Sequence, residues 1–82
     1  MDIDRLVGAN LRKMRKSSGL TQEGLAGESG ISPQHLSRIE RGVCSPTTRL
    51  LHKLARALDV EIERFFEYAD ADTMFYIYTR LD

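Results

Sequence analysis

Apolar residues recur at every third or fourth position along most of the chain, which is the spacing of one face of an α-helix. This spacing predicts a first helix over about residues 4–17. Its inward stripe is Ile3, Leu6, Val7, Asn10, Leu11 and Met14. A second long stripe follows Thr47, a good cap residue, and has Leu50, Leu51, Leu54, Ala55 and Leu58 on its buried side. Helices with such stripes pack against each other and bury a common core.

Between the two long stripes, the chain first shows the pattern of a short helix that ends in a tight turn. Thr21 suits the cap position in front of this helix, and Gly30 suits its end because glycine adopts the left-handed conformation readily. Gly24 and Gly27 lie inside it. Each costs roughly 0.5–1 kcal/mol relative to alanine, so we expect this helix to be locally loose.

A second short helix opens directly after the turn, at Ser32 and Pro33. Serine is a good cap, and proline suits the first helical position, where its missing N–H costs nothing. Leu36 and Ile39 share one face, which leaves on the other faces Gln34, Ser37, Arg38 and Arg41. Gly42 then suits a left-handed helix end. Two short helices joined at a glycine turn have the pattern of a helix-turn-helix, whose second helix enters the DNA major groove.

The last part of the chain predicts a fifth short helix over residues 62–68, with Ile62, Phe65 and Phe66 as its apolar residues. One phenylalanine can close the core, and the other needs a second partner, for which a dimer seam is the economical answer. Residues 73–81 are rich in aromatic and β-branched residues and predict a strand. We expect this strand to pair with its copy in another subunit or to pack on the fifth helix, and a disordered or helical tail is the alternative. The residues expected at the dimer contact are Phe66, Tyr68, Phe75 and Ile77.

Length and composition fit one small globular domain. The chain has 82 residues, of which 41% are apolar and 29% charged. A domain this small is marginally stable alone, which favours dimerisation. No stretch reaches the roughly 18 apolar residues that span a bilayer. The first residues lack the basic and apolar regions of a signal peptide, so we expect a cytoplasmic protein without membrane contact.

The charges are unevenly distributed although the formal net charge is +0. Residues 12–49 carry seven Lys and Arg against three Asp and Glu, whereas residues 50–82 carry four against seven. The half that contains the helix-turn-helix pattern is therefore basic. A neutral chain of this kind can still present one positive face to phosphates.

The sequence of the short helix pair resembles the lambda-repressor/Cro-like (XRE) family of DNA-binding proteins. The matching motifs are L-T-Q-E-x-L-A from Leu20, the turn glycine Gly30, I-S-x-x-x-L-S-R-I-E-R-G from Ile31, Pro46, and L-x-K-L-A-R-A-L-D-V from Leu51. The resemblance covers roughly residues 5–67. It implies an all-α, five-helix DNA-binding domain, to which we assign residues 1–69. Residues 70–82 lie beyond the resemblance and form a short C-terminal extension that we expect to serve dimerisation.

Two side chains of the second short helix are the strongest candidates for reading bases. Gln34 can bind adenine with two hydrogen bonds, and Arg38 can bind the N7 and O6 atoms of guanine in the same way. Their spacing of four residues directs both into one groove. Pro33 stands where many relatives carry a polar base-reading residue, so it offers only an apolar contact, for example to a thymine methyl. Ser32 is a lesser candidate for a base contact.

Other residues are expected to bind the DNA backbone. Gln22 lies at a helix start, where free N–H groups favour a phosphate, and the resemblance implies the same role for it. The remaining backbone candidates are Arg12, His35, Ser37, Arg41 and Thr47.

The resemblance also implies a structural ion pair. By analogy with phage repressors of the family, Arg15 in the first helix should reach Glu40 near the end of the recognition helix. Such a partly buried pair holds the two helices together, and removing one partner costs roughly 3–5 kcal/mol.

Two classes of function fit these features. The first is a transcriptional regulator that binds a palindromic operator in double-stranded DNA as a homodimer, with its occupancy set by the monomer–dimer equilibrium. The second is an antitoxin-type interaction module whose acidic, aromatic tail binds a partner protein and whose DNA binding serves feedback. An enzyme is not expected, because Cys44 has no nucleophile motif around it. No metal-ligand spacing appears, so we expect neither a metal nor a cofactor.

Overall fold

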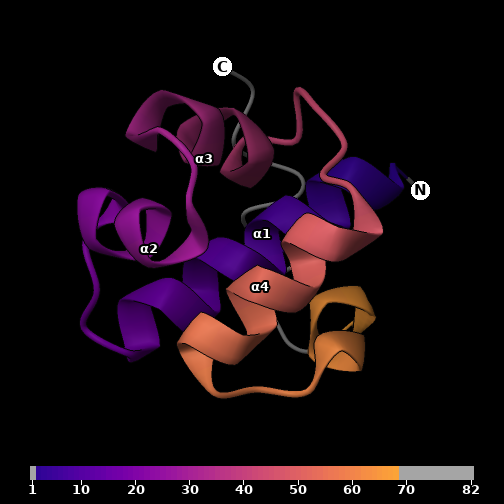
Figure 1. The fold of residues 1–82 in the computed structure, drawn as a ribbon. Helices are drawn as coiled ribbons and strands as arrows, with labels where there is room; N and C mark the ends of the chain where they lie inside the picture. The colour runs from indigo at the N-terminus through magenta and orange to yellow at the C-terminus, as the bar shows by residue number, and fades with distance from the viewer. Residues whose placement is uncertain (1, 69–82) are drawn as a thin grey trace.

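The computed structural model describes residues 2–68 and shows a helical domain (Figure 1). Four α-helices, α1 (Ile3–Ser17), α2 (Gln22–Ser29), α3 (Pro33–Glu40) and α4 (Thr48–Leu58), are followed by the 3₁₀ helix η1 (Ile62–Phe66). No strand occurs within residues 2–68. The predicted all-α class is confirmed for this part of the chain, whereas the predicted strand over residues 73–81 lies outside it.

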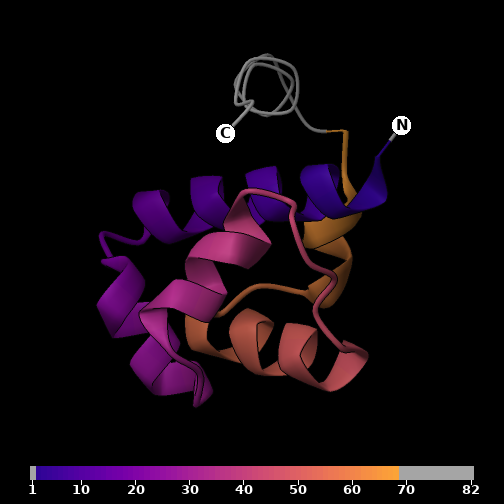
Figure 2. The same ribbon diagram turned by 90° about the horizontal axis from the view of Figure 1, so that it is seen from above.

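Helices α1 and α4 form two opposite sides of the domain. Figure 2 shows α2 and α3 closing one end of the space between them and η1 closing the other. Accordingly, α1 packs on α3 and η1, and α4 packs on α2 and η1. The short helix pair is therefore supported from both sides by longer helices.

The hydrophobic core consists of the inward faces that the spacing predicted. Its buried residues include Val7, Leu11 and Met14 from α1, Leu25 and Ala26 from α2, Leu36 and Ile39 from α3, Leu50, Leu51, Leu54, Ala55 and Leu58 from α4, and Phe65 from η1. Ile3 was expected in this stripe but is 51% exposed. It is the first residue of α1, and no other element within residues 2–68 covers it.

Side-chain caps fix the starts of all four α-helices. Thr21, Ser32 and Thr47 each accept a hydrogen bond from a backbone N–H of the first turn, as the sequence predicted. Asp2 does the same for α1, accepting from the amides of Asp4 and Arg5, so this helix starts slightly earlier than expected. The N–H groups that a helix start leaves unpaired are thereby partly satisfied.

The fifth predicted helix is a 3₁₀ helix that ends at Phe66, not an α-helix that reaches Tyr68. Only Phe65 of its five residues is buried, so little packing energy favours a longer, regular helix. Asn10 of α1 instead fastens the segment, because its Nδ2 donates to the carbonyl oxygens of Phe65 and Glu67 at 2.8 Å each.

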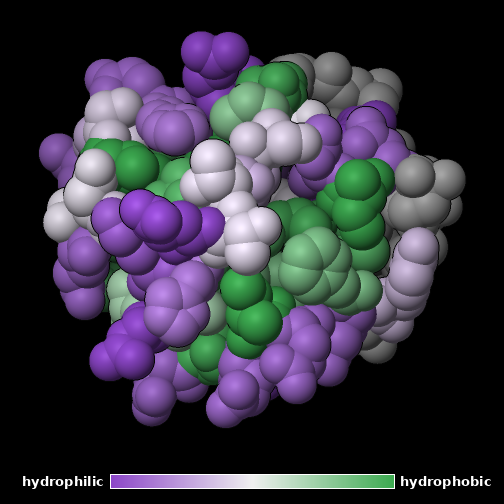
Figure 3. All heavy atoms as spheres, turned by 45° about the vertical axis from the view of Figure 1, so that its right-hand side comes forward, coloured by the Kyte–Doolittle hydropathy of each residue, from purple (hydrophilic) through white to green (hydrophobic). Residues whose placement is uncertain are grey.

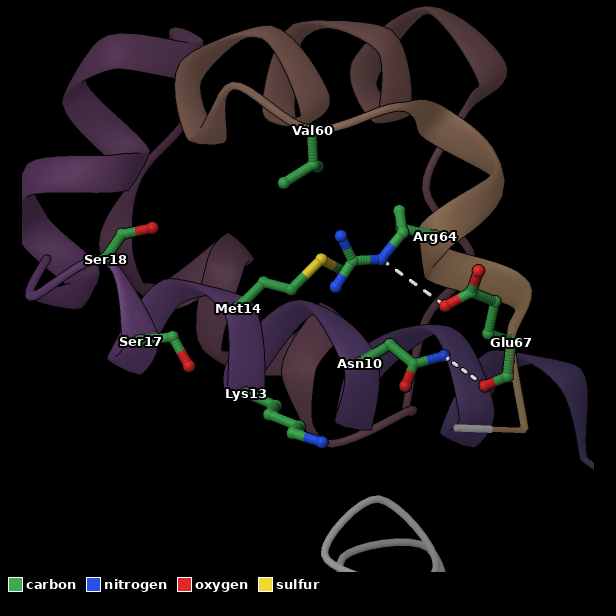
Figure 4. A pocket seen from close by; sticks show the side chains of 8 residues that line it. All are labelled: Asn10, Lys13, Met14, Ser17, Ser18, Val60, Arg64 and Glu67. Carbon is green, nitrogen blue, oxygen red and sulfur yellow. Dashed lines mark hydrogen bonds and ion pairs between the residues drawn. The ribbon is translucent and has the colours of Figure 1, made fainter. Parts of the chain in front are cut away.

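Figure 4 shows the hydrogen bond from Asn10 to Glu67 at the edge of a hollow of about 190 Å³ between α1 and η1. Met14 and Val60 supply apolar lining, and Arg64 Nε lies 3.3 Å from Glu67 Oε1. Both partners of this ion pair are half-exposed, and such pairs contribute little to stability.

Candidate DNA-binding surface

Helix α3 separates its buried and exposed residues as the sequence predicted. Leu36 and Ile39 are fully buried. Gln34 and Arg38 lie exposed on the opposite side of the helix, one turn apart. The helix therefore presents to solvent the two side chains best suited to read base edges.

The close approach of α1 to α3 depends on Gly8. A Cβ atom at this position would lie 2.3 Å from the carbonyl oxygen of Ile39 and 2.7 Å from that of Glu40. These are backbone atoms, so the two helices can cross here only if residue 8 is glycine. This role was not predicted from the sequence. The only signal was a glycine inside an otherwise helical pattern, which indicates a packing or functional reason.

The predicted ion pair between Arg15 and Glu40 is confirmed. Arg15 Nε lies 2.7 Å from Glu40 Oε2, and Arg15 Nη2 lies 3.1 Å from Glu40 Oε1. Only 8% of the Arg15 side chain and 1% of the Glu40 side chain are exposed. Arg15 Nη1 also donates to the carbonyl oxygen of Leu20 at 2.8 Å, which fixes the link between α1 and α2. The pair thus holds the end of α3 against α1.

Gln22 joins the same cluster, which the sequence did not predict. Its Nε2 donates to Glu40 Oε1 at 3.0 Å. The residue is partly buried at the start of α2. The Gln22 side chain, which was predicted to bind a phosphate, is therefore held by α3 through Glu40.

The other predicted contact residues lie mainly at helix starts and on α3. Ser32, His35 and Thr47 are exposed, and Pro33, Ser37, Arg41 and Arg12 are partly buried. The hydroxyl of Ser32 accepts from the amide of His35 at 3.0 Å, and that of Thr47 accepts from the amide of Leu50 at 3.1 Å. Both hydroxyls therefore already serve as caps.

The loop between α3 and α4 rests on the start of α1. Ser45 donates its hydroxyl to the Asp4 carboxylate. Gly42 has a φ of 75° and packs so closely on Arg5 that a Cβ would lie 2.7 Å from its Cγ. The predicted left-handed glycine after α3 is thus confirmed, and Cys44 in this loop is partly buried against the core.

Neither a metal site nor a membrane-spanning helix is found among residues 2–68. No group of three or more His, Cys, Asp or Glu residues among them lies close enough to hold a metal ion. None of the helices in this part of the chain combines the length and apolar character needed to cross a bilayer.

Comparison with known proteins identifies the family. Residues 11–65 match the family model described as helix-turn-helix. The chain belongs to the XRE-type helix-turn-helix family. Members of this family are DNA-binding transcriptional regulators, and the helix-turn-helix of this chain is formed by α2 and α3.

Curated relatives of this helix-turn-helix protein have names of the same kind. The uncharacterised HTH-type transcriptional regulator y4dJ of Sinorhizobium fredii is 48% identical over 60 residues, which cover 73% of this chain and 78% of that protein. The HTH-type transcriptional regulator SlrR of Bacillus subtilis is 42% identical over 72 residues, which cover 87% of this chain but only 45% of that protein.

Solved structures show the same fold. The restriction-modification controller protein C.AhdI from Aeromonas hydrophila aligns with a TM-score of 0.75 and 36% identity, covering 77% of this helix-turn-helix chain and 96% of that one. The clp gene regulator ClgR from Corynebacterium glutamicum aligns with a TM-score of 0.73 and 31% identity, covering 92% of this chain and 71% of that one.

Proposed function

We propose that this transcriptional regulator binds a palindromic operator as a homodimer and acts without a cofactor. Each α3 would enter the major groove of one half-site, with the two half-sites about one helical turn of DNA apart. The observation that carries the proposal is the exposure of Gln34 and Arg38 on a helix whose other side is anchored in the core. We place this activity in the cytoplasm.

Base recognition in this proposal rests on α3. Gln34 binds adenine and Arg38 binds guanine, each with two hydrogen bonds. Ser32 and Pro33 lie at the start of the helix and add short contacts. The backbone contacts come from Gln22, Arg12, His35, Ser37, Arg41 and Thr47, and these position the domain without reading sequence.

Dimerisation in this proposal uses the face at the start of α1 and around η1. Phe66 is 43% exposed although its neighbour Phe65 is fully buried. Figure 3 shows apolar side chains gathered on this face, and the exposed large apolar residues include Ile3, Phe66 and Tyr68. A second copy would cover them, as expected for a self-complementary interface. The predicted contacts of Phe75 and Ile77 lie outside the described residues and remain part of this proposal.

The antitoxin-type alternative depends on residues 70–82, which the structure does not describe. The relatives and solved structures above are regulators and controller proteins. We therefore propose the regulator function alone, and a partner protein enters only as an outcome of the experiments below.

The base-reading role is tested by selecting bound sites from a random DNA pool with the wild-type protein and with two arginine variants. Arg38→Ala should weaken binding to the preferred site by about 1–3 kcal/mol and relax the preference at one base pair. Arg56→Ala is the matched control, because Arg56 is an exposed arginine on α4 and not on α3. An unchanged base preference in the Arg38 variant would refute the assignment.

The dimer is tested by sedimentation of the full chain with and without operator DNA. Phe66→Ser should shift the protein towards monomer and weaken operator binding, while its helical circular dichroism stays unchanged because Phe66 lies outside the core. A wild-type chain that stays monomeric at high micromolar concentration, even on DNA, contradicts the dimer. A complex with an added partner protein and no self-association would support the antitoxin-type alternative instead.

A further inference from the structure

One carboxylate connects the three helices that build the DNA-binding surface. Glu40, the last residue of α3, accepts from Arg15 of α1 through both oxygens and from Gln22 of α2 through Oε1. The family resemblance implied the Arg15 contact, and nothing in the sequence gave a reason for the Gln22 contact. The bond between Gln22 and Glu40 therefore needs its own explanation.

We propose that Glu40 is a positioning residue for DNA-backbone binding, which orients the Gln22 amide so that an N–H group meets a phosphate. This inference rests on the proposed DNA-binding function. It adds to that function a residue that touches no DNA itself and acts only through Gln22.

The chemistry of the amide supports this role. A glutamine side chain has a donor end with two N–H groups and an acceptor end, whereas an ionised carboxylate only accepts. With Nε2 of Gln22 at 3.0 Å from Glu40 Oε1, one N–H is used and the second stays available. In the reversed amide, two acceptor oxygens would face each other at this distance. Glu40 therefore selects the orientation that leaves a donor for a phosphate oxygen.

The charge of Glu40 is compatible with a DNA-binding surface because the guanidinium group of Arg15 neutralises it. Arg15 forms two hydrogen bonds to this carboxylate, at 2.7 and 3.1 Å, and both side chains are more than nine-tenths buried. A bidentate pair of this kind is strong and geometrically defined. The carboxylate can therefore hold Gln22 without repelling the DNA backbone.

The arrangement also couples two kinds of contact. Gln34 and Arg38 read bases from α3, and the last residue of the same helix holds the backbone-binding side chain of α2. A shift of α3 would displace both. The register of the base contacts and that of the phosphate contact are thus set by one helix.

The experiment is a double-mutant cycle in the full chain, with Kd measured on the selected operator and on unrelated DNA. Gln22→Met keeps the length of the side chain but removes its donors, and should weaken binding to both DNAs by a similar factor, about tenfold. Glu40→Gln lets the side chain at position 40 present either an acceptor or a donor to Gln22. It should weaken binding by up to the same factor in the wild-type background and by no further factor in the Gln22→Met background.

Equal losses from Glu40→Gln in both backgrounds would overturn the proposal, because Glu40 would then act on α3 as a whole. Thermal unfolding of each variant sets a temperature at which all four proteins are folded. Glu40→Gln should lower thermal stability in both backgrounds, so stability and Kd respond differently if Glu40 acts through Gln22.

A second measurement needs no Glu40 variant. In the free wild-type protein, the side-chain amide of Gln22 should show slower hydrogen exchange than that of Gln34, which is exposed on the same surface. Equal exchange rates for the two amides would overturn the proposal. If this inference fails but Arg38→Ala still relaxes the base preference, the proposed function stands. If the protein binds no DNA at all, both the inference and the proposed function are wrong.

Discussion

Helices α2 and α3 have the same length, eight residues each, but are held in different ways. Helix α3 is fixed along its whole length by its cap, by two fully buried side chains and by the buried carboxylate at its end. Helix α2 contains Gly24 and Gly27, and besides its cap it has the buried residues Leu25, Ala26 and Ser29. We expect the two glycines to make α2 the looser helix. Helix α3 carries the proposed base contacts, and α2 carries the proposed phosphate contact.

This difference follows from what each contact requires. A bidentate bond to a base edge needs both partners in one geometry, whereas a phosphate presents several equivalent oxygens and carries no sequence information. Packing is therefore most valuable at α3. The predictions below test whether the two helices differ as their construction implies.

The largest effect is expected from Arg15→Met. This change leaves the Glu40 carboxylate buried without its cation and should lower the free energy of unfolding by about 3–5 kcal/mol. Urea denaturation followed by circular dichroism measures it. The double variant Arg15→Met with Glu40→Met should recover most of the loss, since an apolar pair needs no charge compensation. A loss below about 1 kcal/mol in the single variant would show that the pair is not needed to fix α3.

Gly8→Ala should be next, because the added Cβ would overlap the backbone of α3 at Ile39. Overpacking of this kind costs about 1–3 kcal/mol, and more where backbone must move. Because the displaced element is α3, affinity for the selected operator should fall more than affinity for unrelated DNA. Stability and both affinities unchanged from the wild type would mean that the crossing of α1 and α3 tolerates a side chain.

The two caps offer a matched comparison of the helices. Ser32→Ala and Thr21→Ala each remove one hydroxyl acceptor, for the amide of His35 in α3 and of Gly24 in α2. Each should cost about 1 kcal/mol. Amide hydrogen exchange should report faster opening at the start of α3 in the first variant and of α2 in the second. Opening of both helices in either variant would show that they behave as one unit.

The smallest effect is a gain from Gly27→Ala. Gly27 is exposed inside α2, and a Cβ there would meet no atom within 4 Å. Alanine should stabilise the protein by roughly 0.5–1 kcal/mol, as judged by thermal unfolding. Gly24→Ala should gain less, since its Cβ would lie 3.3 Å from the Thr21 hydroxyl. A destabilised Gly27 variant would mean that α2 needs its looseness to fold.

Local patterns in the sequence were sufficient to predict most of the fold. The caps Thr21, Ser32 and Thr47, the turn at Gly30 and the buried faces depend on residues near one another in the chain, and the structure confirms them. The ion pair of Arg15 with Glu40 came from the family resemblance and is confirmed as well. The DNA contacts remain predictions.

Features that depend on distant parts of the chain were missed. Gly8 matters only because α3 crosses there. Asn10 was expected on the inward stripe, but its bonds to carbonyl groups 55 and 57 residues away were not predicted. Likewise, the length of η1 is limited by how few of its side chains reach the core, which spacing alone does not reveal. These facts belong to tertiary packing, and helical periodicity carries no information about them.

The two bonds from Asn10 to the carbonyl groups of Phe65 and Glu67 have a mechanical consequence. Asn10 lies five residues before Arg15 on α1. One helix therefore carries both the side chain that binds the last described segment and the side chain that binds Glu40 at the end of α3. Tension applied through that segment, as in a single-molecule pulling experiment, would load α1 first. Rupture at Asn10, together with withdrawal of Phe65 from the core, would then release η1 while leaving the helix pair in place.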